Sequence, residues 1–432
     1  MIISVPRLTI RIHDNPLLQD ADMSIYFIQK HRTPGSSKAM NAWSFHQFNL
    51  LLQMLKVHQE ELGKHRHAFH ILLVDQKEQK KILSHLHSKG HDIITDVVTD
   101  PSFKPISFAT EMSTHTLIDW TEPENTKFIK DFWEKSKIYG KLDPIKRHVV
   151  AMKVPKPDMS IRPKKSIMMS VELRELLSPY EANLSQMLDE TQALMREAGM
   201  TVHKFPSTEK TLLSQAKKAI AFISNPKWYK PKTSVGLEYM ERSKKPLKNS
   251  SQLSPLLSVG ALSPRFFWHS IRTTKTDMGS GRDQLLFRES FHTVALAHKF
   301  GAKGRVRDFW SNNAKSAFTN NDYKWKTSVT KELRAWQNGE LKGAFKDTND
   351  SMKSLWNLGW IHHLRRHLVA DVLTRGKLGI HWQRGEQWFR HTLIDHDAVV
   401  NRCNWMWLAA VAFSSKQKVY HYNANDYVRR NT

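Results

Sequence analysis

The sequence predicts an α/β N-terminal domain built on a parallel sheet, followed by a larger all-α C-terminal domain. Up to about residue 120, short apolar runs that are typical of buried strands alternate with amphipathic stretches of helical period. Strands that alternate with helices favour a parallel sheet covered on both faces. Beyond about Phe205 the strand patterns fade, and helical periodicity continues to Trp407, with most of the 14 Trp residues in this half.

Local patterns predict the elements of the N-terminal domain one by one. A helix is expected from Ala42 to Leu62, where apolar residues form one stripe and Gly63 acts as a stop. A second helix, rich in Lys and Gln, is expected from Lys77. Apolar runs predict strands at Ser24–Ile28, Phe69–Val74, Asp92–Val98 and His115–Trp120.

A change of composition indicates where the domains meet. The segment from Lys153 to Ser166 is rich in proline and basic residues, which is typical of an exposed connector. We therefore expect the α/β domain over residues 1–125, an interdomain connector over 126–204 and the all-helical domain over 205–432.

Composition limits the class of protein. Lys and Arg total 66 against 41 Asp and Glu, a formal charge of +25, which favours a polyanionic partner. Nucleic acid, an anionic membrane surface and a generally basic protein all fit that charge. The mean hydropathy is −0.53, and the sequence has neither an apolar run of membrane-spanning length nor a signal-peptide pattern. A single cysteine, Cys403, excludes an internal disulfide and cysteine-rich metal modules. We expect a soluble, intracellular, monomeric protein that is nuclear if its source is eukaryotic.

Three groups of residues resemble the photolyase/cryptochrome family. They are the Arg-x-His-Asp-Asn-Pro-Leu-Leu run at 11–18, the paired Leu-Ser-Pro motifs between Leu253 and Arg265, and the stretch from Gly359 to Trp407. Within that stretch, the His-His-Leu-x-Arg-His form at 362–367 is similar to the (6-4) photolyase and animal cryptochrome branch. The resemblance implies a Rossmann-like N-terminal domain and a helical FAD-binding domain, with a shortened C-terminus.

A histidine pair is the main catalytic candidate. His363 and His367 are four residues apart, so on a helix they share one face with Arg366 nearby. Such a pair can be packing residues, a zinc pair that lacks the Glu of His-Glu-x-x-His, or acid–base catalysts. The resemblance implies that they face a DNA lesion, where an imidazolium acts as general acid when a hydroxyl or amino group returns to its base.

The resemblance also implies a set of FAD-binding residues. By default, Asp395 and Asp397 would be N-cap residues of the next helix. The resemblance instead places Asp395 in an ion pair with Arg366 beside the flavin, and Asn401 at the flavin's reactive nitrogen, where an amide can accept or donate a hydrogen bond. The full implied set is Tyr239, Ser250, Ser251, Leu253, Ser254, Gln284, Arg288, Arg366, Asp395, Asp397 and Asn401.

Electron transfer and DNA binding are implied in the same way. Trp405, Trp382 and Trp325 match the family's electron relay, although tryptophans at such spacings are ordinarily core residues. The DNA-binding candidates are Phe287, Arg288, Lys303 and Arg305. The partner implied is UV-damaged DNA. No metal is expected, and nothing identifies an antenna chromophore.

Several positions depart from the family pattern. Phe287 replaces a usual Trp, Arg402-Cys403-Asn404 replaces small residues beside the flavin, and a Gly-Tyr-Pro motif is missing after Gly339. The expected function is light-driven repair of (6-4) photoproducts. A cyclobutane-dimer photolyase, a cryptochrome photoreceptor without repair activity and a nucleic-acid-binding relative that has lost its flavin remain open alternatives.

Overall fold

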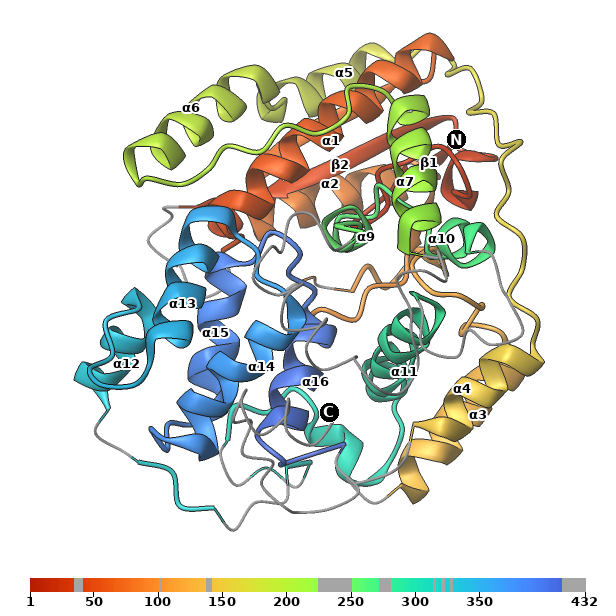
Figure 1. Cartoon of the computed structure of the whole chain (residues 1–432). Helices are drawn as coiled ribbons and strands as arrows, with labels where there is room; N and C mark the ends of the chain where they lie inside the picture. Colours follow the sequence, from red (N-terminus) through yellow and green to blue (C-terminus); the bar gives the residue numbers. More distant parts are fainter. Residues whose placement is uncertain are drawn as a thin grey trace. The chain divides into compact units, whose positions relative to one another are not determined.

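Figure 1 shows the computed structural model of the chain. Contacts within the chain divide it into two compact units. One unit combines Met1–Thr121, Val154–Lys218 and Leu253–Ser270, and the other combines Glu122–Lys153, Ala219–Gln252 and Ile271–Thr432. The residues described are 1–34, 42–101, 103, 105–136, 142–223, 251–271, 281–313, 316, 318–319, 323–326 and 329–413. We call the two units the sheet unit and the helical unit.

The sheet unit contains a five-stranded parallel sheet of order β3-β2-β1-β4-β5. Its strands are β1 (Ile2–Val5), β2 (Met23–Gln29), β3 (Phe69–Val74), β4 (Asp92–Asp96) and β5 (Thr110–Met112). Parallel strands need crossovers between them, and helices supply several of these here. The expected α/β class is therefore confirmed.

One strand was expected in the wrong place. Residues His115–Trp120 form no strand. The edge strand beside β4 is instead β5, which pairs with β4 through Ile94↔Thr110. Leu117, Ile118 and Trp120 are buried, which explains their strand-like pattern. Local side-chain bonds hold this segment in an irregular form, since the Thr116 hydroxyl donates to the Ile118 carbonyl at 2.9 Å.

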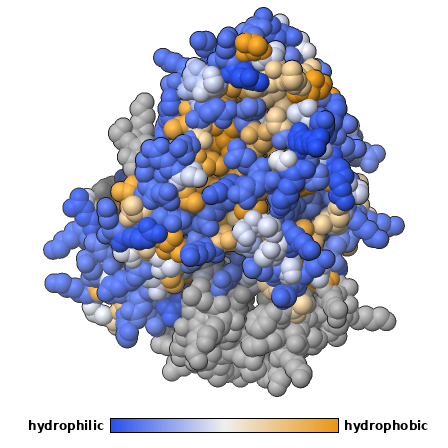
Figure 2. Space-filling model, turned by 90° about the horizontal axis from the view of Figure 1, so that it is seen from above, coloured by the Kyte–Doolittle hydropathy of each residue, from blue (hydrophilic) through white to orange (hydrophobic). Residues whose placement is uncertain are grey.

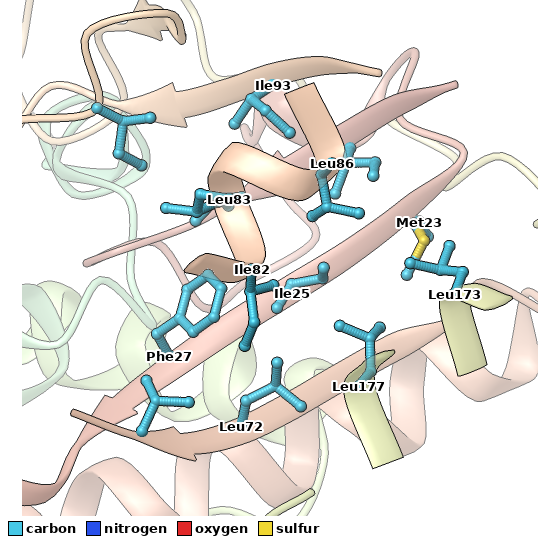
Figure 3. Packing of buried hydrophobic residues seen from close by; sticks show 14 residues of the cluster. Met23, Ile25, Phe27, Leu72, Ile82, Leu83, Leu86, Ile93, Leu173 and Leu177 are labelled. Atoms are coloured by element: carbon cyan, nitrogen blue, oxygen red, sulfur yellow. The ribbon is translucent and has the colours of Figure 1, made fainter. Parts of the chain in front are cut away.

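Helices α1 (Phe45–Lys64) and α2 (Gln76–Ser88) form much as their patterns indicate. Ser44 caps α1, and Asp75 caps α2 in a reciprocal capping box with Glu78. Figure 3 shows α2 laying Ile82, Leu83 and Leu86 over the sheet. Alternate residues of β2, Met23, Ile25 and Phe27, point to that same core. Further helices are α5 (Val171–Leu177), α6 (Leu184–Glu197), which packs on α1, and α7 (Glu209–Ile223).

A buried network joins two of the sequence motifs inside the sheet unit. Arg11 is 1 % exposed and donates to the carbonyls of Gly260 (2.9 Å), Thr114 (2.7 Å), His13 and Asp14. Asp14 accepts from Arg265 at 2.9 Å and from the Ser263 hydroxyl. The 11–18 motif and the second Leu-Ser-Pro motif, which opens α10 (Pro264–Ser270), therefore hold each other in place.

Gly260 is expected to be irreplaceable in this network. It has φ +70°, and a Cβ there would overlap the carbonyl oxygen of Leu8. Gly260→Ala should therefore destabilise the protein by about 3 kcal/mol or more. Gly63→Ala is the matched control, because Gly63 is an exposed helical residue with nothing within 4 Å of a Cβ, and it should stabilise by about 0.5–1 kcal/mol. Thermal unfolding midpoints that move equally in both variants would contradict this interpretation.

The helical unit begins earlier in the sequence than expected. Helices α3 (Pro123–Lys135) and α4 (Asp143–Ala151) pack on α11 (Gly281–Lys299), and Trp133 Nε1 donates to Thr293 Oγ1 at 3.1 Å. The structure thus divides the expected connector 126–204 between the two units. Residues up to Lys153 join the helical unit because α3 and α4 bury apolar stripes there.

The remaining described elements of the helical unit are also helices. They are η6 (Gly304–Asp308), α12 (Thr330–Asn338), α13 (Lys346–Leu358), α14 (His363–Asp371), the π-helix η7 (Val372–Gly376), α15 (Trp382–Thr392) and α16 (Ala398–Leu408). Helix α9 (Ser254–Ser258) belongs to the sheet unit. The face drawn in Figure 2 is largely hydrophilic, with apolar side chains interspersed. No helix within the described ranges is long and apolar enough to cross a bilayer.

Candidate functional site

Three histidines gather at the start of α14. His363 opens the helix and His367 lies one turn later, with ring centroids 5.9 Å apart. His362 lies 4.4 Å from His363 by centroid distance, and the His367 ring meets Trp407 of α16 edge-on at 5.5 Å. The two histidines expected from the sequence therefore lie close together, with the His362 ring beside His363. No group of three or more His, Cys, Asp or Glu side chains arranged for a metal occurs in the part of the chain described.

The surroundings of the pair hold both rings neutral. Burial is the main cause, and it lowers the pKa of His363 to about 2 and that of His367 to about 4. His362 and the nearby Arg366 guanidinium contribute to both of these reduced pKa values. The imidazolium expected from the sequence is thus disfavoured at pH 7 in the free protein.

Arg366 and Asp395 form an ion pair in which the carboxylate is buried and the guanidinium is partly exposed. Arg366 Nη2 lies 2.9 and 3.1 Å from the two carboxylate oxygens, and Asp395 is 4 % exposed. Arg366 Nε donates to the Ile361 carbonyl at 2.9 Å, which ties the pair to the segment before α14. Since a buried charge is costly without a partner, each residue depends on the other.

Asp397 caps α16 and also contacts two basic side chains of α11. Its Oδ1 caps α16 by accepting from Val399 N (3.1 Å) and Val400 N (3.0 Å). Its Oδ2 meets His292 Nε2 at 3.1 Å and Arg288 Nη2 at 3.5 Å. Burial alone would raise the pKa of Asp397, but His292, Arg288 and the backbone N–H groups together hold it far below its usual range. His292 was missed from the sequence, although it follows Arg288 by one helical turn.

Asn401 lies one turn after Asp397 on α16 and is buried. Its Nδ2 donates to the Glu386 carbonyl of α15 at 3.0 Å. An amide nitrogen has two N–H groups, so Asn401 can donate a second hydrogen bond as well as accept one through Oδ1. Helices α14, α15 and α16 lie together in Figure 1, and α16 packs on both of the others.

The tryptophans of the expected relay are placed in different surroundings. Trp405 and Trp382 are each 2 % exposed. Trp405 meets Phe389 at 5.0 Å and Trp336 at 6.3 Å, and its indole lies so close to Gly385 that a Cβ there would overlap it. Trp336, a core residue whose Nε1 donates to the Val369 carbonyl, was not anticipated.

Trp325 connects to Trp382 through an intervening ring. The centroid of His381 lies 5.0 Å from that of Trp325 and 5.6 Å from that of Trp382. His381 Nδ1 accepts from Gln383 N at 3.3 Å, which fixes the imidazole at the start of α15. A continuous line of ring contacts therefore runs from Trp325 to Trp382.

The remaining candidates belong to other segments of the chain. Tyr239 and Ser250 lie outside the described residues, while Ser251, Leu253 and Ser254 fall where the chain passes from the helical unit to the sheet unit. On α11, Gln284 and Phe287 are exposed and Arg288 is half-buried. Lys146 of α4 lies with its ammonium 3.3 Å from the Phe287 ring centroid. Lys303 and Arg305 are exposed at η6.

Buried neutral histidines should make the protein acid-sensitive. His58 of α1 is 2 % exposed, neither ring nitrogen has a hydrogen-bond partner among the described residues, and burial lowers its pKa to about 4. Below about pH 6.5 such a histidine binds a proton in the unfolded chain but not in the folded protein. The free energy of unfolding therefore falls as the pH drops from about 6.5 to 4. Each such histidine lowers it by about 1.4 kcal/mol per pH unit.

This dependence is testable by thermal unfolding at pH 7.5 and pH 5. The midpoint should be lower at pH 5, and His58→Phe should reduce the difference because one titrating group is removed. A midpoint that is equal at the two pH values would show that these histidines are not held neutral.

Comparisons with known proteins give consistent results. Residues 281–430 match a family model described as the FAD binding domain of DNA photolyase. A "(6-4)DNA photolyase" of Oryza sativa subsp. japonica is 37% identical over 175 residues, and "Cryptochrome-2" of Gallus gallus is 34% identical over 187 residues. These matches cover 37% and 40% of this chain, but only 28% and 29% of the relatives.

Solved structures extend the likeness over the whole chain at the level of fold. A class III photolyase from Agrobacterium tumefaciens superimposes with a TM-score of 0.66 at 20% identity, covering 100% of this chain and 86% of its own. A Synechocystis cryptochrome gives a TM-score of 0.69 at 17% identity, with the same coverages. At such identities the likeness concerns the fold alone.

Proposed function

The chain belongs to the photolyase/cryptochrome family and carries its FAD-binding domain, and on that premise we propose that it repairs UV-damaged DNA in a light-dependent reaction, with (6-4) photoproducts as substrate. The observation that carries the (6-4) assignment is the pairing of His363 and His367 on one face of α14, beside the Arg366–Asp395 ion pair. This arrangement lies in the part of the chain that matches the family model.

The polar groups of the helical unit suit a flavin. Arg366 and Asp395 offer a fixed cation and carboxylate, and Asn401 offers an acceptor oxygen and a second amide N–H. Asp397 is kept ionised by Arg288 and His292. We propose that these residues hold and orient FAD, which when reduced and excited by light supplies the electron for repair.

The protein's own task is to manage protons. Returning a hydroxyl or amino group between the two damaged bases requires a proton, which His363 or His367 would deliver as a general acid. Because their pKa values are low in the free protein, we propose that the proton is acquired when DNA binds. The phosphates of the substrate would offset the charge of Arg366 and raise both histidine pKa values.

Basic side chains of the helical unit would bind DNA. Arg288, Lys303 and Arg305 are the proposed phosphate ligands, and the exposed Phe287 ring would stack on a base once Lys146 moves from its face. Enzymes that act on a base within a duplex, photolyases among them, generally extrude it from the stack, so the lesion is expected to enter the site flipped out of the duplex.

Signalling without repair is the second candidate function. The similarity to Gallus gallus Cryptochrome-2 supports it, since that relative and the (6-4) photolyases match comparable shares of this chain. The histidine pair does not separate the two candidates, because animal cryptochromes resemble this chain there as well.

DNA binding by the purified protein in the dark tests the proposal. A (6-4) lesion in duplex DNA should be bound more tightly than the undamaged duplex, since a distorted site costs less to open. Affinity for both should fall steeply with salt, as expected when several phosphates are neutralised. Equal affinity for damaged and undamaged DNA would favour the signalling function.

A further inference from the structure

Arg402 is a buried cation at a position where the family pattern has small residues. It follows Asn401 on α16 and is 3 % exposed. Its Nη1 bonds both carboxylate oxygens of Glu386 at 3.0 and 3.1 Å. Its Nε and Nη2 donate to the carbonyls of Phe309 (2.8 Å) and Ser311 (2.5 Å). These bonds fix the guanidinium firmly in one place.

Aromatic rings surround this guanidinium. Its carbon lies 5.0 Å from the Trp382 ring centroid, 5.5 Å from that of Trp310 and 5.9 Å from that of Phe309. Trp382 is one of the three tryptophans that the family resemblance assigns to an electron relay. The closest of these three rings to the buried charge therefore belongs to a residue proposed to lose an electron.

A fixed cation affects the two oxidation states of an indole in opposite ways. The neutral ring attracts a guanidinium through its quadrupole. An indole that has lost an electron is positive and is repelled by the same charge, strongly so where burial reduces screening. The Glu386 carboxylate partly compensates this repulsion. The balance between Arg402 and Glu386 thus sets how readily Trp382 is oxidised.

We propose that Arg402 is a positioning residue that makes Trp382 harder to oxidise and so limits light-driven electron delivery to the flavin. The inference rests on the proposed function, and it assumes the relay through Trp405 and Trp382 that the resemblance to the photolyase/cryptochrome family implies. In the step concerned, bound FAD would supply the oxidant, since it would accept one electron from Trp405 when excited by light. One electron then moves from Trp382 to Trp405, so that Trp405 returns to its neutral form, Trp382 is oxidised, and no proton moves.

Two variants should change this step in opposite directions. Glu386→Gln keeps the shape of the side chain but leaves the Arg402 charge uncompensated, so the transfer from Trp382 should slow by about tenfold or more. Arg402→Met combined with Glu386→Gln removes both charges, and the transfer should become faster than in the parent. If Arg402 and Glu386 served only in packing, electron transfer from Trp382 would slow in both variants or in neither.

The measurement is transient absorption of the tryptophan radical after a light pulse, on holoprotein whose flavin content and thermal midpoint have been checked. Arg402→Lys is the conservative control, since it retains the charge and should stay as slow as the parent. If Arg402→Lys instead matches the double neutral variant, or if the two principal variants change in the same direction, the inference is overturned.

Trp382→Phe separates this inference from the proposed function. If that substitution leaves the transient unchanged, the relay is absent and the inference about Arg402 falls, whereas repair by chemically reduced protein, the proposed function, is not contradicted. If Trp382→Phe abolishes the second transfer while the charge variants behave like the parent, the relay stands and Arg402 has no influence on it.

Discussion

Replacing His363 or His367 with Ala is expected to lower the rate of (6-4) photoproduct repair by about 10²–10⁴-fold, the usual contribution of a general acid. The rings lie 5.9 Å apart on one face of α14, so each can reach a substrate placed against that face. Flavin binding should survive, because neither histidine belongs to the Arg366–Asp395 pair. Single-turnover repair by chemically reduced protein, illuminated under saturating DNA, measures the effect.

His87→Ala is a suitable control, since His87 is exposed on α2 of the sheet unit. It should repair at the parental rate. A double variant lacking both His363 and His367 that also repairs at the parental rate would show that the two histidines are packing residues.

The pH dependence has a definite sign. A general acid must be protonated before it acts, and burial lowers the pKa of both rings below the neutral range. Repair should therefore slow as pH rises, and the fall should persist through the neutral range unless bound DNA raises the pKa of the donor. The pH profile of the repair rate can be compared between a lesion in full-length DNA and the same lesion in a dinucleotide. A profile shifted to higher pH on the full-length DNA would show that the additional phosphates raise the histidine pKa.

Asp395→Ala is expected to remove most of the FAD from the purified protein. The change leaves the Arg366 guanidinium without its buried carboxylate, a loss that typically costs about 3–5 kcal/mol. Flavin affinity should therefore fall at least tenfold, and the thermal midpoint should drop as well. Absorption spectra and equilibrium titration with FAD measure the loss of flavin, and thermal unfolding measures the loss of stability.

Asp350→Ala provides the matched control. Asp350 pairs with Lys346 at 2.7 Å, but both side chains are largely exposed, so the pair contributes little and the substitution should change neither flavin content nor stability. Full flavin occupancy and unchanged affinity in Asp395→Ala would contradict the proposed cofactor site.

Much of the fold could be predicted because periodicity is a local signal. The apolar run of β2 and the helical stripe of α1 both reflect burial, and the structure places them as expected. The predicted strand at 115–120 was wrong because residues of this segment are buried without being paired in the sheet. The extent of the helical unit could not be foreseen, since the packing of α3 on α11 joins residues that are distant in sequence.

The site shows the same division. Arg366 and Asp395 could be paired from a family resemblance, and the structure brings them together. The contact of His292 with Asp397 joins α11 to α16, and no spacing along the chain indicates it. Arg402 was recognised as a departure from the family, but its position near Trp382 depends on how α16 packs against its neighbours.

Light-driven repair of one defined lesion tests the proposed function most directly. Protein with reduced FAD is illuminated with DNA carrying a single (6-4) photoproduct, and separately with DNA carrying a single cyclobutane dimer, each beside a dark control. Illumination is expected to restore the (6-4) DNA to intact bases, while the dark control remains damaged. Repair of the cyclobutane dimer alone would contradict the (6-4) assignment, and a protein that holds FAD and repairs neither lesion would contradict the proposed repair function.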